Sequence, residues 1–429
     1  MDAAFLGCAE VFGMRVRGSW VRRVVGFASV ILLAGCNQID ATPRGDGLKG
    51  DPAPELLERA EGGEVSAQLL AGRFYKKAAG DAEEPERARR EAEALRWLTL
   101  AAEEGNAQAQ TDLGVMLVSA EGLNRNLAEG RRWLTRAGET GQAPAFFMLG
   151  ELSKTGEGSA PNPMMAVTFW THAADLGHTG ALHRLGEAHE QGLGVDPDLE
   201  TALRFYRSAS SKGYAASQYR LAVIFDEGVM VGRDALEAVK YYRMAAEQGY
   251  APAQAQLGFL YARGDGVVQR YDEAQRWSRM AAEQGDADGC NNLAVLYLKG
   301  LGVSQSFDDA LRWYRLAAQR RHPGAQNMLG TIYLTGQGVE VDVKEAEHWW
   351  RMAAEQGYAS AQYNVGGMYS RKLSKTLTRD EALDWLGRAA EQGHRSAMKE
   401  LAELQTSVAE ESAAAAEQAV AAPLERTML

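Results

Sequence analysis

Cysteine is scarce in this sequence, which has only three among 429 residues: Cys8, Cys36 and Cys290. Cys8 and Cys36 lie close to the N-terminus, so Cys290 is the single cysteine of the rest of the chain. No disulfide can therefore form within that part. Long apolar runs are also lacking, and the apolar stretch 24–33 is too short to span a bilayer. These gaps exclude a disulfide framework, and they exclude a membrane span in this stretch.

An excess of basic charge is missing as well. The chain has 46 Lys and Arg against 57 Asp and Glu, a formal net charge of −11. Residues 1–35 hold four basic and two acidic residues, so the chain without them has 42 against 55, a net charge of −13. This balance argues against nucleic acid or an anionic lipid surface as the main partner.

A glycine recurs every 36 residues and closes a segment of the form A-A-E-Q-G. The glycines are Gly105, Gly141, Gly177, Gly213, Gly249, Gly285, Gly357 and Gly393, and only Arg321 departs from the series. A fixed period of this length indicates stacked helical repeats, because each unit is too small to bury its own apolar face. We therefore predict a solenoid, which binds along an extended surface.

Each unit predicts two amphipathic helices joined by a loop, as in residues 249–284. One position of the second helix is aromatic in all nine units: Trp97, Trp133, Phe169, Phe205, Tyr241, Trp277, Trp313, Trp349 and Trp385. We expect these rings to fill the gaps between helices. The alanine four residues later, such as Ala281, allows the neighbouring helix to approach closely.

The ends of the second helices are also readable. Their expected N-cap residues are Asn126, Asn162, Asp198, Asp234, Arg270, Ser306, Asp342 and Thr378, and seven of these eight can cap. The periodic glycine supplies the left-handed residue that ends the helix. Arg321 must take that conformation at a cost of roughly 1 kcal/mol, or the helix ends differently there. The recurring G-x-G loops, such as Gly264 and Gly266, join two helices, so we interpret them as turns and not as phosphate-binding loops.

The period, the A-A-E-Q-G motif and the motif Y-L-T-G-Q-G-V at 333–339 resemble the Sel-one-like repeat family, a relative of the tetratricopeptide repeat. The resemblance implies an all-α fold, a right-handed α-solenoid superhelix of stacked helix-turn-helix repeats of 36 residues. It covers residues 63–404. We count nine units, beginning at 63, 105, 141, 177, 213, 249, 285, 321 and 357, and a closing helix at 394–404. The first unit is six residues longer, and some secreted members have a cysteine pair per repeat that this chain lacks.

The N-terminus resembles a bacterial lipoprotein signal peptide. Arginines at 15, 17, 22 and 23 precede the apolar stretch 24–33, and L-A-G-C ends at Cys36. The resemblance implies that residues 1–35 are removed and that Cys36 is lipidated. Residues 1–13 do not fit the pattern, and Met14 is the alternative start. Asn37 then favours the outer membrane, with the mature protein facing the periplasm.

Segments of low complexity flank the repeats. Residues 36–62 contain several prolines and glycines and predict a lipid anchor with a flexible tether. Residues 405–429 are rich in Ala and Glu and predict a disordered tail or a frayed helix.

Signatures of catalysis are weak. Residues 396–399 match S-x-x-K and residues 154–156 match K-T-G, but S-D-N is absent and the two matches lie about seven repeats apart. Four histidines cluster at 172, 178, 183 and 189, yet His183 and His189 are six residues apart, whereas two ligands on one helix face are four apart. His189 occupies the position of Tyr261 and Tyr297, which indicates packing. We predict no enzyme, no metal site and no cofactor.

Variable positions on the first helices are the candidate binding site, because these helices line the concave face of related solenoids. The pair that follows A-x-A-Q reads His183-Arg184, Tyr219-Arg220, Ala255-Gln256, Asn291-Asn292, Asn327-Met328 and Tyr363-Asn364. Asparagine can donate to and accept from a peptide backbone, and tyrosine adds amphipathic contact area. The predicted partner-binding residues are Asn291, Asn292, Asn327, Asn364, Tyr219, Tyr363, Arg220 and Gln256. An ordinary solvated polar face is the competing interpretation.

Together these features predict an envelope-anchored scaffold that binds a partner protein or an extended peptide. A cell-wall-directed hydrolase and a glycan-binding module are the alternatives. The sequence leaves open the partner and its pathway, whether secretion, cell wall or polysaccharide export, as well as the oligomeric state and the side of the outer membrane.

Overall fold

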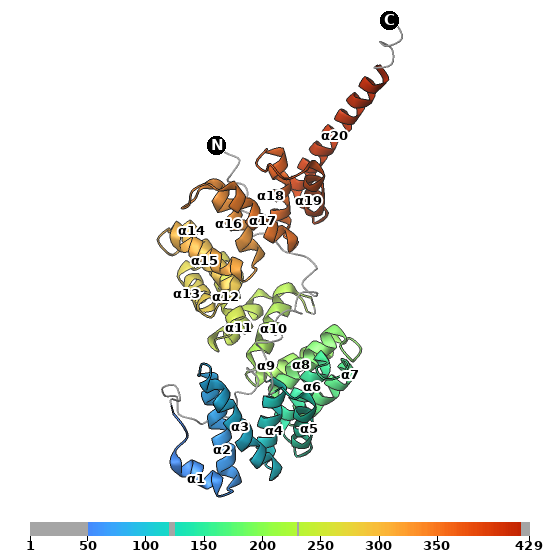
Figure 1. Ribbon diagram of the computed structural model, residues 1–429. Coiled ribbons are helices and arrows are strands. Elements are labelled where there is room, and N and C mark those ends of the chain that lie inside the picture. Colours follow the sequence, from blue (N-terminus) through green and yellow to red (C-terminus); the bar gives the residue numbers. More distant parts are fainter. Residues whose placement is uncertain (1–49, 120–124, 230, 422–429) are drawn as a thin grey trace. The chain divides into compact units, whose positions relative to one another are not determined.

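The computed structural model describes residues 50–119, 125–229 and 231–421 (Figure 1). Every regular element in these ranges is a helix, and there are twenty of them. They fall into two compact units, one made of the described residues up to Gly232 and one made of those from Arg233 onwards. We call these the N-terminal unit and the C-terminal unit. The expected signal peptide, Cys36 and most of the tether lie outside the described residues.

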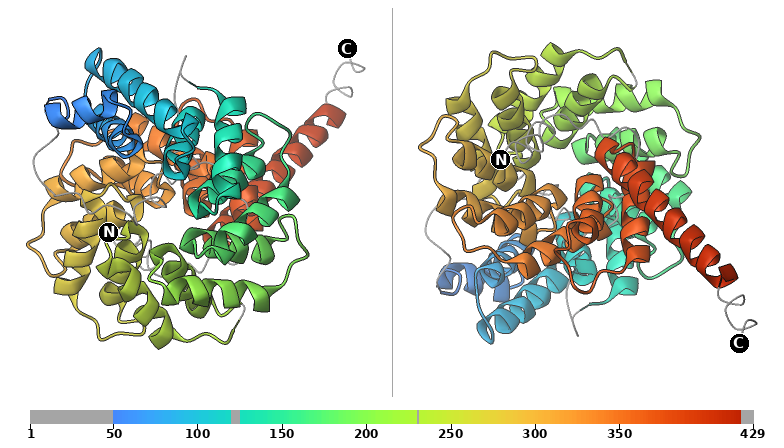
Figure 2. Two further views of the ribbon diagram at one scale, coloured as in Figure 1. Left: turned by 90° about the horizontal axis from the view of Figure 1, so that it is seen from below. Right: turned by 90° about the horizontal axis from the view of Figure 1, so that it is seen from above.

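Two kinds of helix alternate along the chain, and within each unit successive helices pack side by side (Figure 2). The first helices of the repeats are α2 (Val65–Gly80), α4 (Ala107–Ser119), α6 (Ala143–Thr155), α8 (Thr179–Gln191), α10 (Ala215–Glu227), α12 (Ala251–Arg263), α14 (Ala287–Lys299), α16 (Pro323–Thr335) and α18 (Ala359–Ser370). The second helices are α3 (Glu86–Glu103), α5 (Leu127–Glu139), α7 (Pro163–Asp175), α9 (Leu199–Ser211), α11 (Ala235–Glu247), α13 (Tyr271–Glu283), α15 (Phe307–Gln319), α17 (Val343–Glu355) and α19 (Arg379–Glu391). In the part of the chain described here, no helix is both long and apolar enough to cross a membrane.

The second helices end as the periodic glycines predict. Gly285 has φ +84°, and its amide donates to Ala282 O at 2.9 Å. Arg321 takes the same left-handed conformation, with φ +62° and a bond of 2.9 Å to Ala318 O. The helix before Arg321 therefore ends like the others, in spite of the side chain. The backbone is unfavourable there for a residue with a Cβ atom.

The predicted N-caps are confirmed. The side chains of Asn126, Asn162, Asp198, Asp234, Ser306, Asp342 and Thr378 each accept a backbone N–H bond from the first turn of the helix, whereas Arg270 makes no such bond. At α19, Thr378 and Glu381 form a complete capping box. The caps satisfy amides that would otherwise lack a partner.

The G-x-G loops are turns between helices, as expected. The first glycine ends the first helix in the left-handed conformation, for example Gly300 with φ +66°. The second glycine packs against the start of the second helix in the preceding repeat, since a Cβ atom on Gly302 would lie 2.7 Å from Cβ of Tyr271. Close approach of neighbouring repeats explains why this position is glycine.

Large side chains of the second helices pack on small residues of the first helices. A Cβ atom on Gly114 would lie 2.7 Å from Cγ of Leu134, and one on Gly330 would lie 2.5 Å from Cδ1 of Trp350. Eight repeats have a large side chain at this position that is at most 2% exposed: Leu98, Leu134, Trp170, Tyr206, Tyr242, Tyr314, Trp350 and Leu386. We call it the inner position.

The aromatic residues predicted to fill the core lie one residue earlier, and their burial differs between repeats. Trp97, Trp133 and Trp277 are buried, whereas the other six are half-buried. In most repeats the core is therefore centred one residue later than expected. The alanine four residues after this aromatic position is fully buried in every repeat, as predicted.

Glutamines join consecutive helices. The glutamine of the A-x-A-Q motif is buried, and its side-chain amide donates to a carbonyl near the end of the preceding helix. These bonds run from Gln68, Gln110, Gln218, Gln254, Gln326 and Gln362 to Ala60, Ala102, Ser210, Ala246, Ala318 and Ala354 respectively, at 3.0–3.4 Å. Cys290 replaces the glutamine in one repeat, with Sγ 3.9 Å from Ala282 O. The sequence analysis gave these glutamines no role.

Both ends of the described chain are more helical than expected. Helix α1 (Pro54–Glu61) lies within the predicted tether, and Ala60 is buried against the first repeat. Helix α20 (Arg395–Ala421) continues past residue 404, where the closing helix was expected to end. Alanine and glutamate favour helix, and Arg379 of α19 holds Glu411 through two bonds of 2.6 and 3.0 Å. Residues 405–421 are thus helical, the second of the two alternatives that the sequence offered for this segment.

Candidate functional site

The predicted binding residues divide between the two units. Asn291, Asn292, Asn327, Asn364, Tyr363 and Gln256 lie on α12, α14, α16 and α18 of the C-terminal unit, whereas Tyr219 and Arg220 lie on α10 of the N-terminal unit. We call the surface of α12, α14, α16 and α18 that contains the first six residues the amide face.

Two asparagines on the amide face join neighbouring first helices. The Asn292 side chain donates to Ala255 O at 3.0 Å, which links α14 to α12. Asn364 donates to Oδ1 of Asn327 at 2.9 Å, which links α18 to α16. Asn327 is buried, with 8% of its surface exposed, and its backbone carbonyl accepts from Nε1 of Trp350 at 3.1 Å. These side chains therefore have structural partners, and Asn327 is the least accessible to a ligand.

Other residues of the amide face remain open to a ligand. Gln256 and Asn291 are half-buried, and their side chains have no hydrogen-bond partner among the described residues. The Tyr363 hydroxyl accepts from Arg371 at 2.9 Å, and its ring stacks on His394 with centroids 4.7 Å apart. Burial is the main cause that raises the pKa of Tyr363, which keeps its hydroxyl neutral. The face thus combines free amides with an oriented tyrosine.

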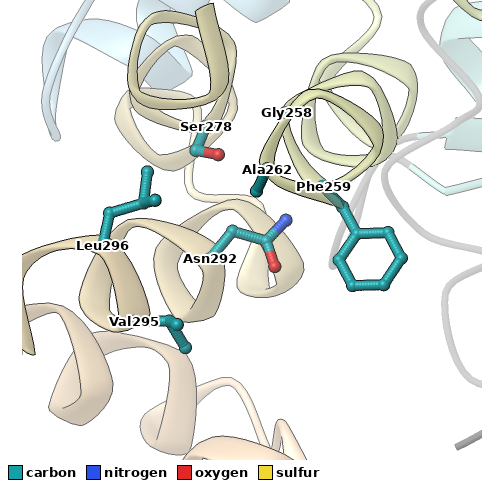
Figure 3. Close-up of a pocket in the computed structure, with 7 residues that line it drawn as sticks. All are labelled: Gly258, Phe259, Ala262, Ser278, Asn292, Val295 and Leu296. Carbon is teal, nitrogen blue, oxygen red and sulfur yellow. The ribbon is translucent and has the colours of Figure 1, made fainter. Parts of the chain in front are cut away.

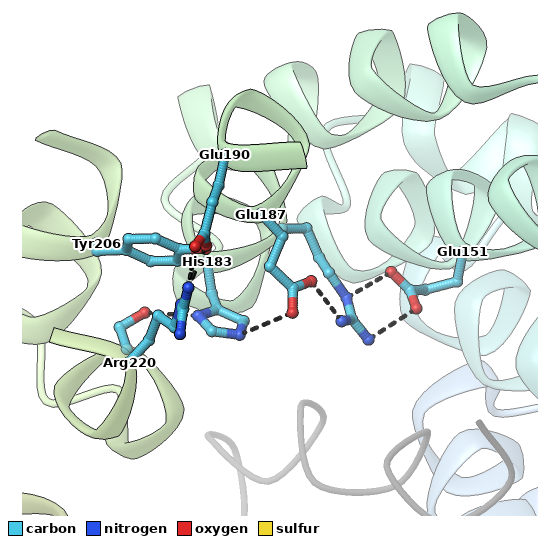
Figure 4. A network of polar contacts seen from close by, with 8 residues as sticks. Glu151, His183, Glu187, Glu190, Tyr206 and Arg220 are labelled. Atoms are coloured by element: carbon cyan, nitrogen blue, oxygen red, sulfur yellow. Dashed lines mark hydrogen bonds and ion pairs between the residues drawn. The ribbon is translucent and has the colours of Figure 1, made fainter. Parts of the chain in front are cut away.

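The N-terminal unit has a polar network on its first helices (Figure 4). Arg184 of α8 donates to both carboxylate oxygens of Glu151 on α6, at 2.9 and 3.0 Å, and to Glu187 at 2.7 Å. His183 lies 2.9 Å from Ser217 Oγ and 3.5 Å from Glu187. Burial would raise the pKa of Glu187, but His183 and Arg184 outweigh it and hold the pKa far below its usual range. Glu187 is therefore a carboxylate.

A second part of the network contains the predicted residue Arg220. Arg220 forms a bidentate ion pair with Glu190, and Tyr206 donates to the same carboxylate at 2.7 Å. The Arg220 guanidinium is thus bound by the Glu190 carboxylate, and this ion pair joins α10 to α8. The sequence analysis singled out Arg220 but not Glu151, Glu187 or Glu190. The available signal was that Glu151 and Glu190 lie on first helices, 33 and 30 residues before the arginines that they bind in the next repeat.

The four clustered histidines have separate surroundings. His172 lies beside Phe146, His178 stacks on Phe147 and His189 stacks on Phe205, with centroids 5.2, 4.4 and 5.6 Å apart. Burial lowers the pKa of His178 to about 4, and its Nδ1 accepts from Ala181 N at 3.1 Å. No group of three or more His, Cys, Asp or Glu in the described part of the chain could hold a metal ion.

A family model described as Sel1 repeat matches nine consecutive segments: 89–106, 107–141, 143–178, 179–214, 215–250, 251–286, 287–322, 323–358 and 359–394. This chain belongs to the Sel1 repeat family. The predicted α-solenoid of 36-residue repeats is thereby confirmed. Residues 63–88 lie outside these matches, although α2 packs on α3 as in the other repeats.

Two solved structures resemble this Sel1 repeat protein. A protective antigen present in uropathogenic Escherichia coli strains is 29% identical, with a TM-score of 0.61 over 81% of this chain and 73% of its own. A Sel1 repeat protein from Oxalobacter formigenes is 31% identical, with a TM-score of 0.52 over 72% of this chain and 90% of its own. No curated protein matched the sequence. Sel1 repeat solenoids are typical scaffolds for protein–protein interaction and are generally not enzymes.

Proposed function

We propose that this Sel1 repeat protein is an envelope-anchored scaffold that holds an extended segment of a partner protein along the amide face. One observation carries the proposal: Gln256 and Asn291 are half-buried amides of consecutive repeats, and neither has a partner among the described residues. Such amides can donate to and accept from a peptide backbone without regard to its side chains.

The surrounding bonds favour a rigid surface. Asn292 ties α14 to α12, so the free amides of Gln256 and Asn291 on these two helices are held in fixed positions before the partner arrives, and Asn364 ties α18 to α16. Preorganisation of this kind lowers the entropic cost of binding. Tyr363, fixed by Arg371 and His394, adds a flat surface at the end of the row. Tyr219 and Arg220 lie on α10 of the N-terminal unit and are separate candidates for partner binding, and Arg220 also holds Glu190.

Anchoring at the envelope is the second part of the proposal. It rests on the lipoprotein-like sequence that ends at Cys36, followed by Asn37. Cys36→Ser should abolish incorporation of a labelled fatty acid in a Gram-negative host and should release the protein from the membrane fraction. Equal labelling of the two proteins would reject lipidation at this residue.

The partner site is tested by affinity capture from solubilised envelope with a double variant, Gln256→Ala with Asn291→Ala. These residues make no bonds that the fold needs, so the variant should fold normally and lose the partners that wild type retains. The matched control is Gln337→Ala with Gln405→Ala, which removes two exposed amides away from the amide face. Hydrogen exchange of the captured complex should show protection on α12 and α14. Identical partners on all three proteins would move the site to another surface.

A further inference from the structure

Three arginines of the C-terminal unit occupy one position on consecutive second helices, and each is held by a tyrosine. In every case Nη2 of the arginine donates to the hydroxyl of a tyrosine that lies 18 residues later, on the next first helix. The pairs are Arg243 with Tyr261, Arg279 with Tyr297 and Arg315 with Tyr333, at 2.8, 2.8 and 2.9 Å. Because equivalent residues of stacked repeats make the same bond, the three pairs lie on one side of the stack. We call them the arginine ladder.

The ladder is open to solvent. The second helices turn their inner position towards the core, and in α13 this residue, Ser278, lies with Gly258 at a small void of about 10 Å³ (Figure 3). Arg279 follows Ser278 and is half-buried, whereas Arg243 and Arg315 are exposed. A partner can therefore reach the ladder without entering the core.

The arginines of the ladder have no carboxylate partner. Each makes its hydrogen bond to the tyrosine, and none forms an ion pair in the described part of the chain. A guanidinium has five N–H donors in a fork that matches a carboxylate, and the tyrosine hydroxyl can still donate its own hydrogen. At the equivalent position of the next repeat, Arg351 binds Glu347 at 2.9 Å, so the ladder ends there.

Other charges near the ladder favour separate carboxylates over a continuous polyanion. A second cation lies three residues before each ladder arginine, on the same helix face: Lys240, Arg276 and Arg312. Two of these three also bind an acid of their own helix. Glu247 and Glu283 lie one turn after Arg243 and Arg279, and in the described structure neither pairs with its arginine. A nucleic acid has a phosphate on every nucleotide and would bring some of them against these acids.

We propose that the arginine ladder binds an acidic peptide segment of a partner protein, with one carboxylate side chain at each of the three repeats. Each carboxylate accepts from the free fork of the arginine and from the tyrosine hydroxyl. The inference does not depend on the amide face, because it uses other residues and another chemistry.

The spacing of the repeats suggests the spacing of the acids. Tyr261 and Tyr297 lie on α12 and α14, which are in direct contact through Asn292 and Ala255. Helices in contact are about 8–10 Å apart, and an extended chain advances roughly 3.3 Å per residue. Acidic residues about three positions apart in the segment therefore match consecutive repeats.

The ladder is tested with a displayed library of random peptides selected on the full-length protein in detergent. Selection should enrich peptides with Asp or Glu about three positions apart. The triple variant Arg243→Gln, Arg279→Gln, Arg315→Gln should bind these peptides about tenfold more weakly, because three charge-assisted contacts are lost. The matched control is Lys344→Gln, Arg388→Gln, Lys399→Gln, which removes the same charge from exposed residues outside the ladder and should change binding less than about twofold.

A second triple variant separates the built pairs from charge alone. Tyr261→Phe, Tyr297→Phe, Tyr333→Phe keeps every arginine and removes the hydroxyls that hold them. It should weaken the acidic peptides about threefold, and circular dichroism checks that each variant is folded. Unchanged affinity would reject the tyrosine hydroxyls as part of the site.

Several results would overturn the ladder and leave the amide face standing. They are equal binding losses in the arginine variant and its control, selected peptides without acidic residues, and failure to enrich any peptide that depends on the three arginines. Single-stranded DNA that binds through these arginines when acidic peptides do not would assign the ladder to nucleic acid. Conversely, the Gln256→Ala, Asn291→Ala variant keeps the ladder and should bind the acidic peptides like wild type, whether or not the amide face is a binding site.

Discussion

Nε2 of Gln356 donates to Oε1 of Gln326 at 2.6 Å, so the glutamine that ends one helix of the repeat holds the glutamine near the start of the other. Gln326 in turn donates to Ala318 O of the preceding repeat at 3.1 Å. Gln284 with Gln254 and Gln392 with Gln362 form the same pair, at 2.7 and 2.8 Å. The glutamines of the A-A-E-Q-G and A-x-A-Q motifs therefore form one connection within and between repeats.

Gln326→Ala should lower the free energy of unfolding by about 1–2 kcal/mol, because Ala318 O and the Gln356 amide each lose one of their hydrogen bonds in a buried setting. Urea denaturation followed by circular dichroism measures the change. Gln337→Ala is the control, since Gln337 is exposed in a loop and its removal should alter stability by less than about 0.5 kcal/mol. Equal effects of the two substitutions would contradict a structural role for the pair.

Arg184→Ala should destabilise the N-terminal unit by about 2–4 kcal/mol, because it leaves Glu151 and Glu187 without their shared cation in a largely buried setting. Hydrogen exchange of α6 and α8 should increase together. Lys399→Ala removes an exposed ion pair with Glu403 and should change stability by less than about 0.5 kcal/mol. Unchanged exchange in α6 would show that the Arg184 bonds do not connect the two repeats.

Stability should fall as the solution is acidified because of His178. Burial lowers the pKa of His178 to about 4 in the folded protein, below its ordinary value of 6.5, so the unfolded chain binds the proton first. The stabilisation is complete above pH 6.5 and is lost progressively as the pH falls towards 4. Thermal unfolding of wild type and His178→Asn, between about pH 7 and about pH 5, measures the difference. Asparagine can still cap α8, so parallel pH curves would rule out His178 as the source.

Arg321→Gly should stabilise the C-terminal unit by about 0.5–1 kcal/mol, because glycine adopts the left-handed conformation at φ +62° without the strain of a Cβ atom. Urea denaturation again provides the measurement. Arg207→Gly, in the middle of α9, is the matched substitution and should destabilise by about 1 kcal/mol. A loss of stability in Arg321→Gly would indicate that the arginine side chain makes a contribution larger than the strain.

The helix ends could be predicted from the sequence because they depend on local chemistry. Asp234 caps α11, and Gly249 ends the turn after this helix. Both roles depend only on residues a few positions away in the sequence. The period of 36 residues also aligns the repeats with one another, so the helix boundaries of one clear repeat predict those of the others.

Packing and side-chain bonding were harder to predict, because a period aligns all positions of a repeat equally. Tyr241 and Tyr242 both recur in register as large residues, and only the structure shows that Tyr242 is the more deeply buried. The asparagines of the amide face were selected as variable polar residues. Asn327 binds its neighbour Asn364 because the two helices are close together. The spacing of residues in the sequence does not give this distance between helices.

The glutamine connections make the length of this protein adjustable in whole steps. If residues 285–320 were deleted, Arg321 would follow Gln284 directly and take the left-handed place of Gly285. Gln326 would then replace Cys290 beside Ala282 O and would supply a hydrogen bond where a sulfur now lies 3.9 Å away. The shortened chain would keep every kind of junction it had before. Natural variation in such a protein can therefore change how far it reaches without changing how it is joined.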